Sequence, residues 1–244
     1  MKITTINSIE TSSICDRKCQ YCPCKDQGKH REVGLMTMEV FEKAMEWILY
    51  FSRQGTQQEL NLFGVGEPTL NPLLPEMIEL AKKNIRIGQP VHINTNGQWI
   101  DTSTTKITEK ELAYVSRLKR AGISHIDLTG HNAFRTAKAI RVLQSVNISG
   151  QLSIDYITNP NTWAGQVEWF PPQYNAGPCP WLLRGQVMIM SNGDVTRCCI
   201  DAFGTGVMGN VMTDDLSKMN CTSFALCESC HHDIGQAEQR RIIL

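Results

Sequence analysis

The stretch from Cys15 to Cys22, CDRKCQYC, places three cysteines in the spacing CxxxCxxC, and Cys24 follows closely. Thiolates are the ligands that soft metals prefer, and three of them can hold three corners of a zinc site or three irons of an iron-sulfur cube. Structural zinc sites usually pair two short cysteine knuckles that lie far apart in the sequence. The triplet therefore favours a cube whose fourth iron has no protein ligand, and an open iron can bind a substrate or a cofactor.

The composition limits the compartment and the partners. The chain has 244 residues, with 24 Lys and Arg balanced by 24 Asp and Glu. Because the net charge is zero, no overall positive potential attracts the chain to nucleic acid or to an anionic membrane. The N-terminal segment MKITTINSIE lacks the apolar run of a signal peptide. We therefore expect a soluble, cytoplasmic protein without nucleic-acid or membrane partners. A reducing cytoplasm makes clustered cysteines metal ligands or catalysts more often than disulfide partners.

Helical and extended patterns alternate between residues 37 and 157. Amphipathic patterns predict helices that begin after Thr37, near Leu73, after Thr108 and near Phe134. The predicted strands cover 60–63, 91–94, 125–129 and 152–157. Strands that alternate with helices form βα units, so we expect an α/β fold with a parallel sheet that is closed or partly closed into a barrel.

The predicted strands have one apolar face and one mostly polar face. The mostly polar face carries Asn61, Phe63, His92, Asn94, Asp127, Thr129, Ser153 and Asp155. Helices must cover the apolar face, so the polar face looks into the barrel, which branched apolar side chains ordinarily fill. Buried polar groups need partners, which favours a ligand inside the barrel. The alternative is that these side chains bond to one another.

Two further motifs follow the cysteine triplet, FGVGEPTLNP (63–72) and INTNG (93–97). In this order, and with Tyr21 just before the third cysteine, they resemble the signature of the radical S-adenosylmethionine (SAM) superfamily over about the first 130 residues. The resemblance implies a partial (βα)6 TIM-like barrel in which Cys15, Cys19 and Cys22 hold a 4Fe-4S cluster and SAM chelates the open iron. An electron from a donor such as flavodoxin or ferredoxin would then cleave SAM, and the 5'-deoxyadenosyl radical would abstract hydrogen from the substrate.

The resemblance also assigns contacts to SAM. Gly64 and Gly66 would let the backbone approach a ligand closely, Glu67 would accept from the SAM ammonium group, and Tyr21 would pack near the adenine. Further SAM contacts are expected at the carboxyl ends of strands, where βα barrels place their chemistry: Asn94, Asn96 and Thr129.

From about Trp163 the sequence becomes rich in proline, glycine and aromatic residues, which places a domain boundary between residues 1–165 and 166–244. The later segments GPCPW, SNGDVTRCCID, GVMGNV and LCESC resemble the SPASM extension of radical SAM enzymes or its shortened form, twitch. The resemblance implies an auxiliary 4Fe-4S cluster, with a hairpin turn at Asn192 and Gly193 presenting one of its ligands. The four expected ligands are Cys179, Cys198, Cys227 and Cys230. A zinc ribbon with four thiolates is the alternative.

A fully ligated cluster has no open iron and most simply moves electrons. The expected net reaction is therefore a two-electron oxidation, a dehydrogenation of a small polar molecule. The short layout resembles small SAM-dependent dehydrogenases of aminocyclitol biosynthesis. His131 and Asp155 are expected to hold or deprotonate the substrate, although either could be a structural polar group.

Three other functions stay open. An epimerase would leave the product mass unchanged. A maturase for peptide or protein side chains is less favoured, because Cys15 lies too near the start of the chain for a leader-recognition domain. A non-enzymatic zinc or iron-sulfur binding module would not need the GVGEP and TNG motifs at strand ends.

Overall fold

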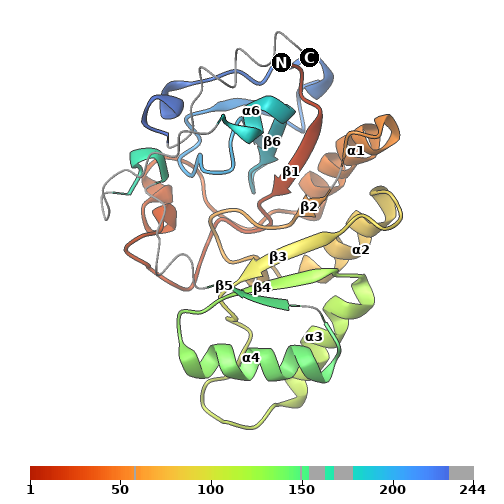
Figure 1. Cartoon of the computed structure of the whole chain (residues 1–244), viewed down its shortest axis with the longest axis vertical. Coiled ribbons are helices and arrows are strands. Elements are labelled where there is room, and N and C mark those ends of the chain that lie inside the picture. Colours follow the sequence, from red (N-terminus) through yellow and green to blue (C-terminus); the bar gives the residue numbers. More distant parts are fainter. Residues whose placement is uncertain (58, 149, 154–162, 168–177, 231–244) are drawn as a thin grey trace.

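The computed structural model describes residues 1–57, 59–148, 150–153, 163–167 and 178–230. Within these ranges eight strands form one sheet in the order β5-β4-β3-β2-β1-β6-β7-β8 (Figure 1). The strands are β1 (Thr5–Ile9), β2 (Leu60–Asn61), β3 (Val91–Thr95), β4 (His125–Thr129), β5 (Gly150–Ser153), β6 (Gln186–Ile189), β7 (Asp194–Thr196) and β8 (Val207–Asn210). The pairs from β5 through β1 to β6 are parallel, and β7 and β8 are added antiparallel. Because β5 and β8 are the two edges of the described sheet, the barrel is partial, as predicted.

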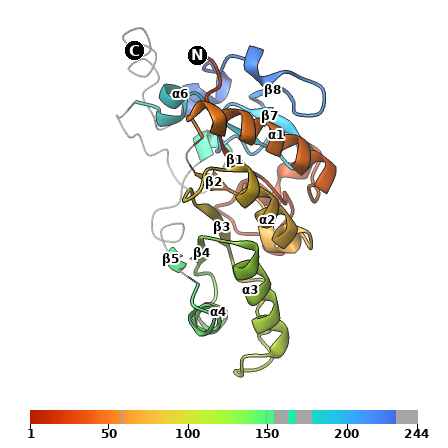
Figure 2. The same cartoon turned by 90° about the vertical axis from the view of Figure 1, so that its right-hand side faces the viewer.

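Four long helices cover one face of this sheet (Figure 2). They are α1 (Met38–Gln54), α2 (Leu74–Asn84), α3 (Glu109–Ala121) and α4 (Ala133–Ser145), and a short α6 (Pro180–Arg184) precedes β6. Thr37 caps α1 by accepting from the Val40 N–H, and Thr108 forms a capping box with Glu111 at the start of α3. The helix starts predicted from these residues are confirmed.

The two faces of the sheet differ as the sequence predicted. Leu60, Val91 and Ile93 are fully buried in the core beneath the helices, whereas His92 and Asn94 on the opposite face are only partly buried. The predicted strand at 152–157 overlaps β5, and its residues from 154 onward lie outside the described ranges. The domain boundary expected near residue 165 stays a prediction, and the sheet itself continues past it into β6.

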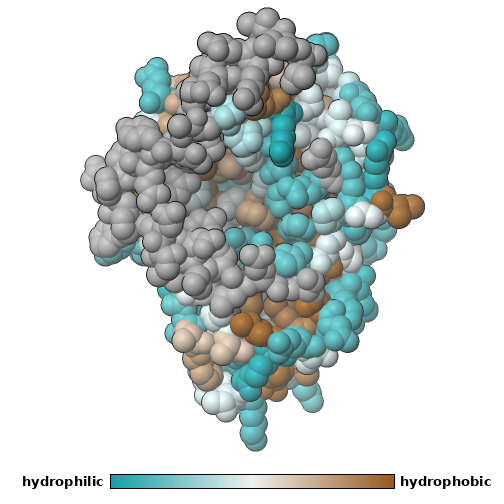
Figure 3. Space-filling model, in the orientation of Figure 1, coloured by the Kyte–Doolittle hydropathy of each residue, from teal (hydrophilic) through white to brown (hydrophobic). Residues whose placement is uncertain are grey.

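Hydrophilic and hydrophobic residues are interspersed on the coloured part of the surface in Figure 3. No helix in the described ranges combines the length and apolar character needed to cross a membrane.

A buried ion pair fastens α4 to α3 away from the cysteines. The Lys138 ammonium group lies 2.8 Å from Glu111 Oε1, and the two side chains are 0% and 1% exposed. Lys138 also donates to the carbonyl oxygens of Asp101 and Thr104. Removing one partner of such a pair leaves an uncompensated buried charge.

We expect Lys138→Met to lower the free energy of unfolding by about 3–5 kcal/mol, because Glu111 then stays buried without its cation. Urea denaturation of wild type and variant measures this. Lys83 pairs with Glu79 at the same 2.8 Å, but those side chains are 65% and 58% exposed, so Lys83→Met should cost less than about 1 kcal/mol. Equal losses in the two variants would contradict the prediction.

Candidate active site

A cavity of about 440 Å³ opens on the polar face of the sheet. It is bordered by Ser8 of β1, Asn94 of β3, Thr129 of β4 and Met188 of β6. Nine of the ten cysteines line it: Cys15, Cys19, Cys22, Cys24, Cys179, Cys198, Cys199, Cys227 and Cys230. The two cysteine sets, which lie more than 150 residues apart in the sequence, therefore face one common space.

The triplet Cys15, Cys19 and Cys22 lies between β1 and α1 as half-buried free thiols. Burial raises the pKa of the Cys22 thiol to about 12, and a hydrogen bond with the Cys24 thiol, followed by burial, raises the pKa of Cys15. A bound metal reverses this, because it holds coordinating thiols in the deprotonated form. Three thiols on one loop facing a cavity fit a cluster with one open iron.

The second set comes from three separate segments. Cys179 directly precedes α6, and Cys198 follows the hairpin of β6 and β7. Cys227 and Cys230 belong to one turn in which the Cys230 N–H donates to the Cys227 carbonyl. Burial, with the neighbouring thiols of the other three residues, raises the pKa of Cys227 to about 11. The four predicted ligands thus border one cavity, but no three of the described His, Cys, Asp and Glu side chains already have the geometry of a metal site. Their role as the four ligands of one cluster stays a prediction.

The other cysteines have different surroundings. Cys199 forms a thiol hydrogen bond with Cys198. Cys24 donates to the Ser13 carbonyl at 3.7 Å. Cys221 is fully buried outside the cavity lining, with its sulfur 3.7 Å from the Gln186 carbonyl oxygen. The predicted hairpin turn before Cys198 is confirmed, with Gly193 at a φ of +91° between the paired strands.

Glu67, expected to accept from the SAM ammonium group, lines the cavity but is only 2% exposed. Its Oε1 accepts from the Thr69 N–H at 3.1 Å and the Thr95 hydroxyl at 2.6 Å. Its Oε2 accepts from the Asn96 N–H at 2.8 Å. These bonds tie the segment after β2 to the end of β3, so Glu67 has a structural role, and its contact with SAM stays a prediction.

Gly64 and Gly66 are packed against the protein itself. A Cβ on Gly64 would lie 2.6 Å from Glu10 Cγ, and one on Gly66 would lie 2.2 Å from the Ser12 carbonyl oxygen. Both glycines line the cavity. Glycine is required at these positions because the segment that leads into the cysteine triplet packs directly against them. From the sequence we expected a bound ligand to be this close neighbour.

The polar residues at the ends of β3 and β4 contact each other and the triplet loop. Asn94 Oδ1 accepts from the Thr129 hydroxyl at 2.8 Å. Asn96 Nδ2 donates to Asp16 Oδ1 at 2.7 Å and lies 3.7 Å from Cys15 Sγ. Asn96 therefore helps to hold the loop, and the contacts of these residues with SAM stay predictions.

His131 and Tyr21 meet at the cavity wall. The Tyr21 hydroxyl lies 2.7 Å from His131 Nδ1, and both residues line the cavity. Burial, reinforced by the charge of Arg17, lowers the pKa of His131 to about 4, so the ring is neutral at neutral pH. The expected packing of Tyr21 on adenine stays a prediction, and Asp155 lies outside the described residues.

Sequence reasoning missed Arg17 and Glu10. Arg17 lines the cavity, and its buried Nε has no hydrogen-bond partner among the described residues. Its position between Cys15 and Cys19 was the available signal. Glu10 is fully buried directly after β1. The only signal in the sequence was an acidic residue at the end of the first extended segment.

The family model described as the Radical SAM superfamily matches residues 9–150, which is more than half of the chain. The chain belongs to the radical SAM superfamily. The predicted enzyme class, the use of SAM and the 4Fe-4S cluster are thereby confirmed, and the C-terminal cysteines fit an auxiliary cluster.

A curated relative from Niallia circulans, S-adenosyl-L-methionine-dependent 2-deoxy-scyllo-inosamine dehydrogenase, is 23% identical over 259 residues, covering 98% of this chain and 97% of that protein. The crystal structure of BtrN in complex with AdoMet and 2-DOIA matches with a TM-score of 0.63 at 22% identity, covering 87% of this chain and 80% of that one. Streptococcus suis SuiB bound to precursor peptide SuiA matches with a TM-score of 0.52 at 14% identity, covering 94% and 70%. These structural likenesses show the fold, and the resemblance to small SAM-dependent dehydrogenases is confirmed.

Proposed function

We propose that this enzyme dehydrogenates a small polar molecule in the cavity shared by the two cysteine sets. That shared cavity is the observation that carries the proposal, because it allows a substrate to lie next to both cofactor sites. Cys15, Cys19 and Cys22 would hold the SAM-binding cluster, and Cys179, Cys198, Cys227 and Cys230 would hold the auxiliary cluster. When bound, SAM and the first cluster would supply a 5'-deoxyadenosyl radical that takes a hydrogen atom from the substrate. The auxiliary cluster would accept the electron that remains on the substrate after it loses a proton.

The chain itself provides groups that can hold a polar substrate and take its proton. The His131 ring is neutral, and in the tautomer whose Nδ1–H donates to the Tyr21 hydroxyl oxygen its Nε2 is free to accept a proton. Arg17 can donate to a substrate oxygen from the cavity wall. Asp155 is a second candidate for the base.

The dehydrogenase from Niallia circulans supports a small-molecule oxidation. The likeness to SuiB bound to a precursor peptide supports a second candidate, modification of a peptide. The dehydrogenase matches almost the whole of this chain, at higher identity than SuiB, and we therefore place the small-molecule oxidation first.

Clustered thiols suit a reducing compartment, so the proposal places the enzyme in the cytoplasm with flavodoxin or ferredoxin as its electron donor. The zero net charge supports the absence of a nucleic-acid partner. The proposal also includes a domain boundary near residue 165, between the radical SAM barrel and the auxiliary-cluster domain.

The test is an anaerobic assay of the reconstituted enzyme with SAM, reductant and a panel of cyclitols and aminocyclitols that begins with 2-deoxy-scyllo-inosamine. The expected result is one 5'-deoxyadenosine per product and a product lighter by two hydrogens. A product of unchanged mass would overturn the proposal in favour of an epimerase. Turnover of peptides but of none of the small molecules would favour the maturase.

We expect His131→Ala to lower product formation by about 100-fold or more, the usual contribution of a general base, while 5'-deoxyadenosine formation continues. Quantifying both compounds in the same reaction checks this. His92→Ala serves as the control, because His92 lies on the same face of the sheet but outside the cavity lining. Full product formation by His131→Ala would remove His131 from the mechanism.

A further inference from the structure

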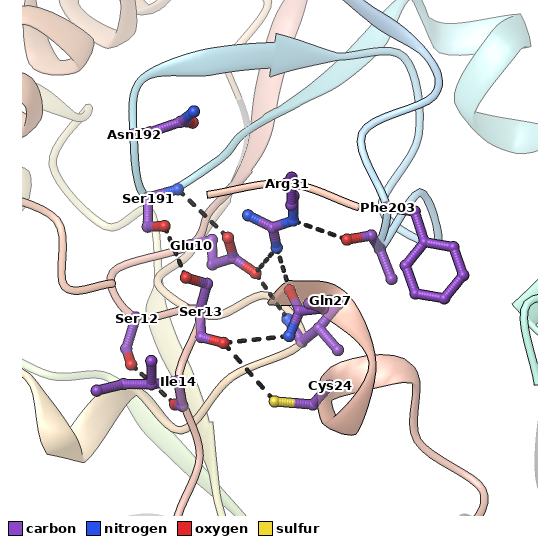
Figure 4. A network of polar contacts seen from close by, with 12 residues as sticks. Glu10, Ser12, Ser13, Ile14, Cys24, Gln27, Arg31, Ser191, Asn192 and Phe203 are labelled. Carbon is purple, nitrogen blue, oxygen red and sulfur yellow. Dashed lines mark hydrogen bonds and ion pairs between the residues drawn. The ribbon is translucent and has the colours of Figure 1, made fainter. Parts of the chain in front are cut away.

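A buried ion pair joins the two ends of the segment that carries the cysteine triplet, and both of its partners also bond to the loop that carries Cys198. Arg31 lies 2.8 Å from Glu10 Oε1, and the two side chains are 7% and 0% exposed. Glu10 follows β1 directly, and Arg31 comes after the triplet and Cys24 (Figure 4). Because the pair is short and shielded from solvent, it holds the backbone at Glu10 and at Arg31 in fixed positions.

The Glu10 carboxylate joins further segments. Besides Arg31, Oε1 accepts from the Val65 N–H at 3.2 Å, and Oε2 accepts from the Ser191 N–H at 3.3 Å. Val65 belongs to the GVGE motif, and Ser191 begins the turn between β6 and β7. One carboxylate thus holds the glycine motif and the C-terminal hairpin against the end of β1.

Arg31 and its neighbours extend the network across the same junction. Arg31 Nε donates to the Ala202 carbonyl at 2.7 Å, and Nη2, which faces Glu10, also donates to Gln27 Oε1. Gln27 in turn donates to the Ser13 carbonyl at 3.1 Å, and the Ser191 hydroxyl donates to the Ser13 hydroxyl at 2.9 Å. These contacts form one connected group in Figure 4.

The network meets each cysteine loop at both of its ends. Ser13 and Gln27 flank the segment that contains Cys15, Cys19, Cys22 and Cys24, while Ser191 and Ala202 flank the segment that contains Cys198 and Cys199. A carboxylate and a guanidinium carry no net charge together. The pair therefore changes the electrostatic potential at a cluster little, and its main effect is to hold the loops in position.

We propose that Glu10 and Arg31 are positioning residues that fix the triplet loop and the Cys198 loop relative to each other, and with them the spacing of the two clusters. The role of Cys198 as a cluster ligand rests on the proposed function. The placement of the two loops by the ion pair does not.

The test compares Glu10→Gln with Glu111→Gln in the reconstituted full chain. The two sites are matched, because each carboxylate is buried, pairs with one cation and accepts from two backbone N–H groups. Hydrogen exchange by mass spectrometry reports the loops, and the EPR spectrum of the reduced protein reports the magnetic interaction between the clusters. In Glu10→Gln, the backbone amides of residues 13–31 and of residues 191–202 should exchange about tenfold faster, which corresponds to a loss of about 1.4 kcal/mol in the free energy of local opening. The magnetic interaction between the clusters in the EPR spectrum should also change. Glu111→Gln should change neither.

Faster exchange in only one loop, or equal effects of the two variants on both loops, would overturn the proposal. If Glu10→Gln does not fold, Ser191→Ala replaces it. This variant should also speed exchange in both loops, but by less, since it removes only the hydroxyl bond to Ser13. Wild-type enzyme that loads both clusters but oxidises no substrate would refute the proposed reaction and leave the exchange result standing. The two failures are therefore distinguishable.

Discussion

Cys19→Ala is expected to abolish 5'-deoxyadenosine formation from SAM while about half of the iron stays bound. Cys19 is the middle cysteine of the triplet and lines the cavity. Its loss leaves two of the three thiolates that a cube with one open iron needs. Cys227 and its three neighbouring thiols are untouched, so the auxiliary cluster should load with about four irons. Iron analysis and chromatography of the SAM products measure the two effects.

Cys24→Ala is the matched control for this loss, because Cys24 lies on the same loop and lines the same cavity. It contacts Cys15 but falls outside the CxxxCxxC spacing. The control should keep SAM cleavage and its full iron content. Cleavage of SAM by Cys19→Ala would show that the assignment of the triplet is wrong.

The second large effect is expected for Cys198→Ala, which should lose substrate oxidation while still producing 5'-deoxyadenosine. The Cys198 thiol is one of the neighbours that raise the pKa of Cys227, and its removal leaves three of the four expected ligands. About four irons should be lost. The triplet, on its own loop, should still support SAM cleavage, so the two reactions become uncoupled.

Cys221→Ala is the control for Cys198→Ala, since Cys221 is also a C-terminal cysteine but does not belong to the second set and does not line the cavity. It should retain all of its iron and its product formation. Simultaneous loss of SAM cleavage and oxidation in Cys198→Ala would mean that the two cysteine sets do not form independent sites.

Local signals account for the parts of the fold that the sequence predicted well. Thr37 and Thr108 start helices because their side chains cap the first free N–H groups of the helix. The alternation around Ile93 and Asn94 separates the helix-covered face of the sheet from the cavity face. Each of these signals depends on neighbours within a few residues, and a single sequence displays them directly.

The contacts that sequence reasoning missed join distant segments. Glu10 bonds to Ser191 across 181 positions, and Gly64 lacks a side chain because Glu10 fills that space. Pairing of β6 with β1 is equally non-local. No periodicity encodes which buried charge will meet which loop, so the glycines of the motif were assigned to a ligand when their close neighbour is the protein chain.

The central claim is that one cavity serves two iron-sulfur clusters, and metal analysis of the wild-type protein tests it most directly. The measurement is iron, sulfide and zinc per chain after anaerobic reconstitution, followed by addition of SAM and dithionite. We predict about eight irons and eight sulfides per chain, together with 5'-deoxyadenosine. Zinc in the second cysteine set, or about four irons in total, would contradict the claim.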